Sequence, residues 1–309
     1  MKASSAPSRR DFLRNSTLSL AAGLLAAPSA RQAFAAGLFQ FKAKLSAHMW
    51  VYASKYPPNW DATADLDKVF SDLHAASFDA VEIMDVILGH DDAVQHLKRL
   101  ADQYELPVSG SSYMGDMWDA TKHDAILADA TKVIKRLGQL EGKTFGISVG
   151  DARHSKTEAE FDAQAKILTS IRKLCADHGI VANLHNHTYE VRDDMHDLKG
   201  TLARIPDFKL GPDLNWLIRG GVDPVSFIKT YGHQMVYMHI RDQYKDGTWT
   251  EYVGQGVTDF PAIAAALRAA NFRGRAAVEL AYEKGFVPKN TLADDWTRSH
   301  DYVVKTFGW

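Results

Sequence analysis

Histidine and carboxylate side chains recur along the chain at the ends of short apolar runs. The set comprises His48, Glu82, His185, His187, Asp213, His239 and Glu279. His239 and Glu279 follow Val-Tyr-Met and Ala-Ala-Val, where a buried imidazole or carboxylate needs a partner. A divalent metal ion supplies such a partner, and the same side chains can also transfer protons. These residue types therefore predict a metal-dependent centre, provided that the fold brings them together.

The apolar runs have the length and composition of β-strands, and amphipathic helical patterns separate them. We predict strands at 44–48, 80–83, 108–111, 144–149, 181–185, 208–213, 235–239 and 276–280. Helical patterns, with apolar residues three and four apart, span 65–76, 92–104, 124–137, 158–176 and 259–270. Asp259 and Pro261 supply the cap and the proline that are typical of a helix start.

Eight strands that alternate with helices predict an α/β fold, the (β/α)8 TIM barrel. No Pro/Gly/Ser-rich linker divides residues 37–309, and a barrel of this type takes about 250 residues, so we expect one domain. The loops after the strands build the active site of such a barrel, at the carboxyl ends of the strands. The imidazoles and carboxylates should therefore meet at one mouth.

Charge and cysteine content argue against a nucleic acid partner and against cysteine-based sites. The 309 residues include 36 Lys and Arg against 38 Asp and Glu, a net charge of -2, which argues against a nucleic acid partner. Cys175 is the single cysteine, so neither an internal disulfide nor a cysteine-based zinc site is available.

The first 36 residues resemble a twin-arginine export signal. Arg9 and Arg10 precede a modestly apolar run at 17–27, and the triplet 33–35 has the small-x-small form that a signal peptidase accepts, which predicts cleavage near Ala36. The run is shorter than the ~20 residues of a transmembrane helix, so we expect a periplasmic or secreted protein with no membrane association in its mature form. The alternative is a basic, alanine-rich disordered arm.

Five stretches carry a family resemblance. They are 184–190 (LHNHTYE), 211–216 (GPDLNW) with 220–224 (GGVDP), 239–242 (HIRD), 254–256 (GQG) and 278–280 (VEL). In this order and spacing, the sequence resembles the sugar phosphate isomerase/epimerase family of the xylose isomerase-like TIM-barrel superfamily. The superfamily also contains ketose 3-epimerases, inosose dehydratases, hydroxypyruvate isomerase and endonuclease IV.

The resemblance implies one divalent metal ion (Mn, Co, Zn or Mg) at the barrel mouth, held by side chains from strands five to eight. Carried over residue by residue, Asp213, His239 and Glu279 take the ligand positions of strands six, seven and eight. His185 aligns with the ligand position of strand five. His187 competes for that role, because the two histidines share one parity of the strand and only their depth distinguishes them.

The fifth strand departs from the family pattern, and the departure bears on mechanism. Ketose epimerases place a glutamate where His185 stands, and they exchange protons between two opposed glutamates. Two histidines and two carboxylates leave a divalent ion formally neutral and a stronger Lewis acid. We therefore expect proton abstraction beside a metal-polarised carbonyl, followed by isomerisation or elimination, with Glu279, His185 or His187 as the catalytic base.

The predicted contacts to the substrate are His48, Glu82, Tyr113, Trp216 and Asp242. Tyr113 and Trp216 have rings that can stack on the apolar face of a sugar, and Asp242 can orient a neighbouring group or bind a hydroxyl. Because phosphorylated sugars are scarce outside the cytoplasm, we expect a non-phosphorylated sugar, keto-sugar, polyol or glycoside.

Two other functions and the oligomeric state stay open. The missing fifth-strand glutamate also fits a non-catalytic exported sugar-binding barrel. An abasic-site nuclease like endonuclease IV shares the fold, but the near-neutral charge, the export signal and the small number of ligands for a three-zinc cluster argue against it. Barrels of this kind often associate through outer helices or loops, so a homo-oligomer is compatible with the sequence.

Overall fold

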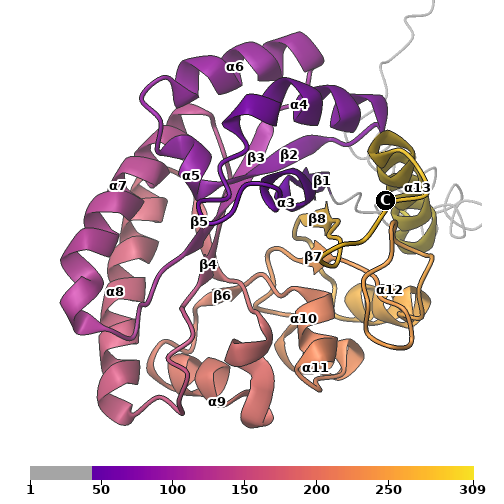
Figure 1. Ribbon diagram of the computed structural model, residues 1–309. Helices are drawn as coiled ribbons and strands as arrows, with labels where there is room; N and C mark the ends of the chain where they lie inside the picture. Colours follow the sequence, from indigo (N-terminus) through magenta and orange to yellow (C-terminus); the bar gives the residue numbers. More distant parts are fainter. Residues whose placement is uncertain (1–43) are drawn as a thin grey trace, which may run out of the picture. The chain divides into compact units, whose positions relative to one another are not determined.

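The computed structural model describes residues 44–309, and the predicted signal segment 1–36 lies outside the described residues. Eight parallel strands alternate with helices, as the sequence predicts. The strands are β1 (Leu45–His48), β2 (Ala80–Met84), β3 (Val108–Met114), β4 (Thr144–Ser148), β5 (Val181–Leu184), β6 (Lys209–Leu210), β7 (His239–Ile240) and β8 (Ala276–Glu279). Figure 1 shows these strands inside a ring of helices.

The longer helices form the outer layer. They are α4 (Leu66–Ala75), α6 (Ala93–Tyr104), α7 (His123–Gln139), α8 (Glu158–Asp177), α9 (Thr188–Arg204), α11 (Pro224–Tyr231), α12 (Phe260–Ala269) and α13 (Leu292–Phe307). The short helices are α3 (Trp50–Ala53), η1 (Thr63–Asp65), α5 (Asp85–Leu88), η2 (Ala120–Lys122) and α10 (Leu214–Arg219). The side chain of Asp259 accepts from the Ala262 amide at 3.0 Å, which confirms the predicted cap of α12.

The strands are buried on both faces, as parallel strands usually are. Inside the barrel, small residues make room for polar ones. A Cβ atom at Gly211 would lie 1.9 Å from the Asn183 side-chain oxygen, so glycine is needed at that approach. None of the described helices has the length and apolarity that crossing a bilayer requires.

The sheet order is β6-β5-β4-β3-β2-β1-β8-β7, and the two ends meet between β6 and β7. Both strands are shorter than predicted, because Pro212 has no amide hydrogen to continue a regular ladder. Two isolated parallel bridges join these segments instead, Leu210 to Met235 and Asp213 to His239. The His239 amide donates to the Pro212 carbonyl at 2.9 Å. This seam closes the barrel and carries two of the predicted metal ligands.

Candidate metal centre and active site

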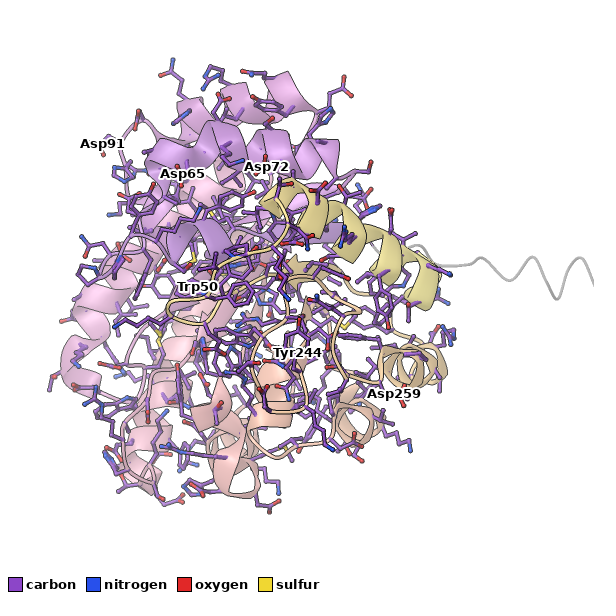
Figure 2. All side chains as sticks on the ribbon, turned by 45° about the vertical axis from the view of Figure 1, so that its right-hand side comes forward. Trp50, Asp65, Asp72, Asp91, Tyr244 and Asp259 are labelled. Carbon is purple, nitrogen blue, oxygen red and sulfur yellow. The ribbon has the colours of Figure 1, made fainter. Side chains whose placement is uncertain are left out.

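A cavity of about 250 Å³ opens among the strand ends. Of the predicted site residues, those that line it are His48, Tyr113, His185, His187, Trp216, His239 and Glu279. Asp213 is fully buried beside the cavity. In Figure 2, Trp50 lies near the centre of the ring of helices and Asp91 at its outer edge.

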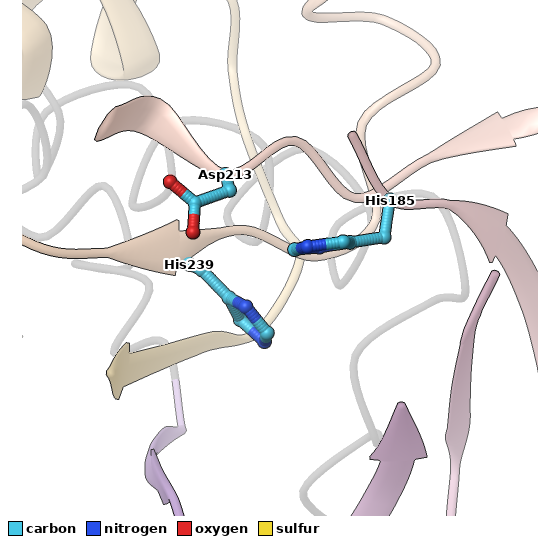
Figure 3. A group of neighbouring side chains, drawn as sticks. All are labelled: His185, Asp213 and His239. Carbon is cyan, nitrogen blue, oxygen red and sulfur yellow. The ribbon is translucent and has the colours of Figure 1, made fainter. Parts of the chain in front are cut away.

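His185, Asp213 and His239 form the candidate metal cluster (Figure 3). One ligand atom from each lies within 4.8 Å of the others. The side-chain nitrogens of His185 have no hydrogen-bond partner among the described residues, and its ring centroid is 4.8 Å from that of His239. Burial, and then the neighbouring imidazoles, lower the pKa of His185 well below its ordinary value, which favours the neutral form that ligates metals.

Asp213 is fixed by the first turn of α10. Its Oδ1 accepts from the amides of Asn215 and Trp216 at 2.8 and 2.9 Å, the usual arrangement of an N-cap. Its backbone amide donates to the side-chain oxygen of Asn186 at 3.2 Å. Oδ2 is buried and has no hydrogen-bond partner among the described residues. One oxygen of Asp213 thus has a structural role, and the other is available to a ligand.

His239 lies between two carboxylates. Its Nε2 is 2.6 Å from Glu82 Oε2, which also accepts from the Tyr237 hydroxyl at 2.7 Å. Its Nδ1 is 2.8 Å from Glu279 Oε2 but is not aligned for a hydrogen bond. Burial opposes protonation of His239, but Glu82 and Glu279 outweigh it and raise the pKa well above its ordinary value. A proton and a metal ion would therefore compete for the lone pair of His239 Nδ1.

Glu279 also contacts Arg241 directly, through Oε1 and the guanidinium. The same guanidinium nitrogen is 3.6 Å from Asp213 Oδ2. Burial would raise the pKa of Glu279, but Arg241 and then His48 lower it well below its ordinary range. Glu279 is therefore a carboxylate at neutral pH and a weak base.

These residues fit a divalent cation. Asp213 Oδ2 and His239 Nδ1 are both buried and without a hydrogen-bond partner, and buried polar atoms of this kind call for a ligand. The set His185, Asp213, His239 and Glu279 offers two imidazoles and two carboxylates, which suit manganese, cobalt or zinc. Glu82 supplies the carboxylate that commonly orients a metal-bound histidine.

His187 points to a different set of partners. Its Nδ1 is 3.1 Å from the Ser148 hydroxyl, and its ring stacks on Tyr189. Ser148 donates to Glu190 Oε1 at 2.5 Å and is 2.7 Å from the Tyr189 hydroxyl. When Glu190 is ionised, the single Ser148 proton goes to the carboxylate, and the Ser148 oxygen can accept from Nδ1–H, which leaves the lone pair of His187 on Nε2. The Tyr189 hydroxyl, 3.2 Å from Nδ1, is the competing partner. Burial lowers the pKa of His187 to about 4, so the imidazole is neutral at pH 7.

Three residues predicted to contact substrate also make contacts within the protein. Glu82 lies behind His239 and does not line the cavity. Tyr113 presents its ring, while its hydroxyl bonds the Ile126 carbonyl at 3.2 Å. The Asp242 carboxylate accepts from the amides of Gly254 and Gly256 at 2.9 and 2.8 Å and so shapes the loop after β7. It is the neighbouring Arg241 that reaches the cavity.

His48 lines the cavity with both nitrogens occupied. Its Nδ1 accepts from the Trp50 amide at 3.1 Å, and its Nε2 is 3.1 Å from the Ser112 hydroxyl. Neither nitrogen therefore offers a free lone pair to a substrate.

Sequence reasoning missed Ser148, Trp60 and Trp249, which all line the cavity. Ser148 is the last residue of β4, so the rule that strand ends build the site would have found it. Trp60 and Trp249 lie on loops whose sequence carries no periodic signal.

The comparisons with known proteins agree with this architecture. The family model described as xylose isomerase-like TIM barrel matches residues 70–303. No curated protein matches the sequence significantly.

Several solved structures share the fold at low sequence identity. A sugar phosphate isomerase/epimerase from Parabacteroides distasonis has a TM-score of 0.68 at 17% identity, covering 86% of this chain and 95% of its own. The 3-keto-D-glucoside 4-epimerase from E. coli has a TM-score of 0.66 at 15% identity, covering 85% and 100%. D-allulose 3-epimerase from Methylomonas sp., in complex with D-allulose, has a TM-score of 0.68 at 19% identity, covering 86% and 98%.

Proposed function

This chain belongs to the xylose isomerase-like TIM barrel family, and from that premise we propose that it is a metal-dependent carbohydrate isomerase or epimerase, or a lyase that begins with the same proton abstraction. The observation that carries the proposal is the convergence of His185, Asp213, His239 and Glu279 from successive strand ends, with Asp213 Oδ2 and His239 Nδ1 buried and without a hydrogen-bond partner among the described residues.

A bound divalent cation supplies Lewis-acid polarisation of a sugar carbonyl. His187 is the base that the hydrogen bonds favour, because His48 has both nitrogens occupied and Glu279 is already engaged by Arg241. Its Nε2 accepts the proton from the carbon beside the carbonyl, and Ser148 holds Nδ1–H. Return of a proton to the former carbonyl carbon gives an isomer, return to the same carbon on its opposite face gives an epimer, and loss of a β-substituent gives elimination.

The charges around the cavity favour a substrate without phosphate. Among the described residues that line it, Arg241 is the sole Lys or Arg, and Glu279 and Asp213 already engage its guanidinium. Asp85 adds a carboxylate to the lining. The proposed export through the twin-arginine route agrees with an uncharged sugar, keto-sugar or glycoside.

Solvent isotope exchange tests the proposal. The protein, loaded separately with Mn²⁺, Co²⁺, Zn²⁺ or Mg²⁺, is incubated in D₂O with D-fructose, D-allulose and a 3-keto-glucoside, and ¹H NMR follows the C–H signals beside the carbonyl. We expect exchange that needs metal and that falls by about 10²–10⁴-fold in His187→Asn, the range for loss of a general base. His233→Asn, at an exposed histidine outside the cavity lining, is the matched control.

Exchange that persists in His187→Asn would assign the base elsewhere. Metal and sugar binding without exchange would favour the non-catalytic sugar-binding barrel, which the absence of a fifth-strand glutamate supports.

A further inference from the structure

The cavity has a polar floor and an apolar rim. The strand-end residues His239, Glu279 and Arg241 are almost fully buried, with exposed fractions of 2%, 7% and 3%. Met114, at the end of β3, is 60% exposed, and Trp60 comes from the loop after α3. Because burial decreases from the strand ends outwards, a ligand that reaches the floor must pass the rim.

One side of the rim is built from two indoles and two thioethers. The rings of Trp50 and Trp60 lie 5.3 Å apart, and both line the cavity with Met84 and Met114. Met84 and Met114 are flexible, polarizable side chains that adapt to apolar ligands. Met114 is one of the few large apolar side chains that are exposed among the described residues. An exposed apolar side chain beside a cavity is a mark of a binding surface.

Two further indoles in the cavity lining, Trp216 and Trp249, have several contacts within the protein. Trp216 and Trp249 meet edge to face at 5.7 Å, and Arg219 and Arg241 lie over both rings at 4.2–5.6 Å. The Trp249 indole donates to the Asn215 side chain at 2.9 Å. The lining therefore combines two indoles held by cation–π and hydrogen-bond contacts with flexible thioether side chains.

Trp60 is held in a backbone conformation that costs energy. Its φ angle is +57°, in the left-handed region that bulky residues rarely adopt. Such conformations persist where surrounding structure imposes them, and they cluster at ligand clamps. In this protein the conformation places the indole against Trp50 in the cavity lining.

We propose that the substrate is a glycoside whose sugar ring carries a ketone and whose aglycone is flat and apolar, such as an aryl group. The sugar lies on the polar floor over the metal centre, and the aglycone lies in the rim against Trp60 and Met114. This inference rests on the proposed function, because it places the sugar at the same centre. It adds that the enzyme selects its substrate by a group that does not react.

Equilibrium binding tests the inference without turnover. The full chain, loaded with Mn²⁺, is titrated with phenyl and methyl D-glucopyranosides, each in both anomers, by calorimetry. We expect the phenyl glycoside of one anomer to bind at least tenfold more tightly than the methyl glycoside of the same anomer. Trp60→Ala and Met114→Ala should each reduce that ratio several-fold, because the phenyl group loses more contact with the rim than the methyl group does.

Trp309→Ala is the matched control, because Trp309 is half-buried beside Phe307 and does not line the cavity. Equal affinities for phenyl and methyl glycosides, no saturable binding of a phenyl glycoside, or a ratio that survives both rim variants would each overturn the inference. Selective phenyl glycoside binding, with no isotope exchange in D-fructose, D-allulose or the 3-keto-glucoside, would sustain the inference and refute the proposed function. Isotope exchange without a preference for the phenyl glycoside would overturn the inference and sustain the proposed function.

Discussion

Replacing Ser148 by alanine should destabilise the protein more than its small volume suggests. The hydroxyl is buried and lies within hydrogen-bond distance of three groups: Glu190 Oε1 at 2.5 Å, the Tyr189 hydroxyl at 2.7 Å and His187 Nδ1 at 3.1 Å. After the change, Glu190 Oε1 retains only the Val149 amide at 3.1 Å. A hydrogen bond to a charged group contributes about 1.5–3 kcal/mol, and a neutral one about 0.5–1.5 kcal/mol.

Water from the cavity can replace the Ser148 hydroxyl as the hydrogen-bond partner of His187 and Tyr189, but not as the partner of the buried Glu190. The loss of the hydrogen bond to the Glu190 carboxylate therefore determines the decrease in the free energy of unfolding. We expect the free energy of unfolding to fall by about 2–3 kcal/mol. The assay is equilibrium urea unfolding of the metal-free protein at pH 8, above the Glu190 pKa of about 7.

The matched control is Ser111→Ala. Ser111 is equally buried, on the neighbouring strand β3, but its hydroxyl donates only to the Ser112 carbonyl at 3.0 Å. We expect a loss below about 1 kcal/mol. If Ser148→Ala and Ser111→Ala reduce stability equally, the assignment of the Ser148 hydrogen bonds is wrong.

Three further predictions concern the metal and pH. His239→Ala and Asp213→Ala should each abolish metal binding while circular dichroism stays native, and full metal occupancy by elemental analysis in both would show that the centre lies elsewhere. Glu82→Gln, which removes the carboxylate behind His239, should weaken metal affinity by about 10–100-fold in calorimetric titrations; an unchanged affinity would mean that Glu82 does not orient the ligand. Burial raises the Glu190 pKa from 4.5 to about 7, so the native state holds a proton that the unfolded state releases in this range. The free energy of unfolding should therefore fall by about 3 kcal/mol as pH rises from 4.5 to 7, and Glu190→Gln should remove this part of the pH dependence in urea unfolding curves.

The fold was predictable because its signals are local. Apolar periodicity predicted a helix at 92–104, and α6 spans Ala93–Tyr104. β6 and β7 are much shorter than predicted, because Pro212, inside the predicted strand 208–213, lacks the amide that would continue the ladder. Strand pairing there depends on contacts between distant segments, which local patterns do not encode.

The residue types of the site could be predicted from the sequence, but the depth of each side chain below the barrel mouth could not. Alternation along a strand indicates which side chains face the barrel axis, but not how far each lies from the mouth. His185 and His187 share a parity, and the structure groups His185 with Asp213 and His239 and directs His187 to Ser148. Glu82 also faces inward, yet it lies beneath His239. The rim could not be predicted, because loop conformation alone places Trp60 and Trp249.

The candidate metal centre spans the seam between β6 and β7, so a bound cation would hold the two segments together. Asp213 and His239 are bridge partners across the junction where regular pairing is shortest, so an opening fluctuation there would separate two ligands at once. A cation that binds only the closed form must suppress that fluctuation by mass action. Amide hydrogen exchange at Val236 and His239, which donate across the seam, should therefore slow on metal addition. Exchange in β2 and β3 should not change. The cation would then govern how often the protein opens, and proteolytic resistance of the region between β6 and β7 would report its occupancy.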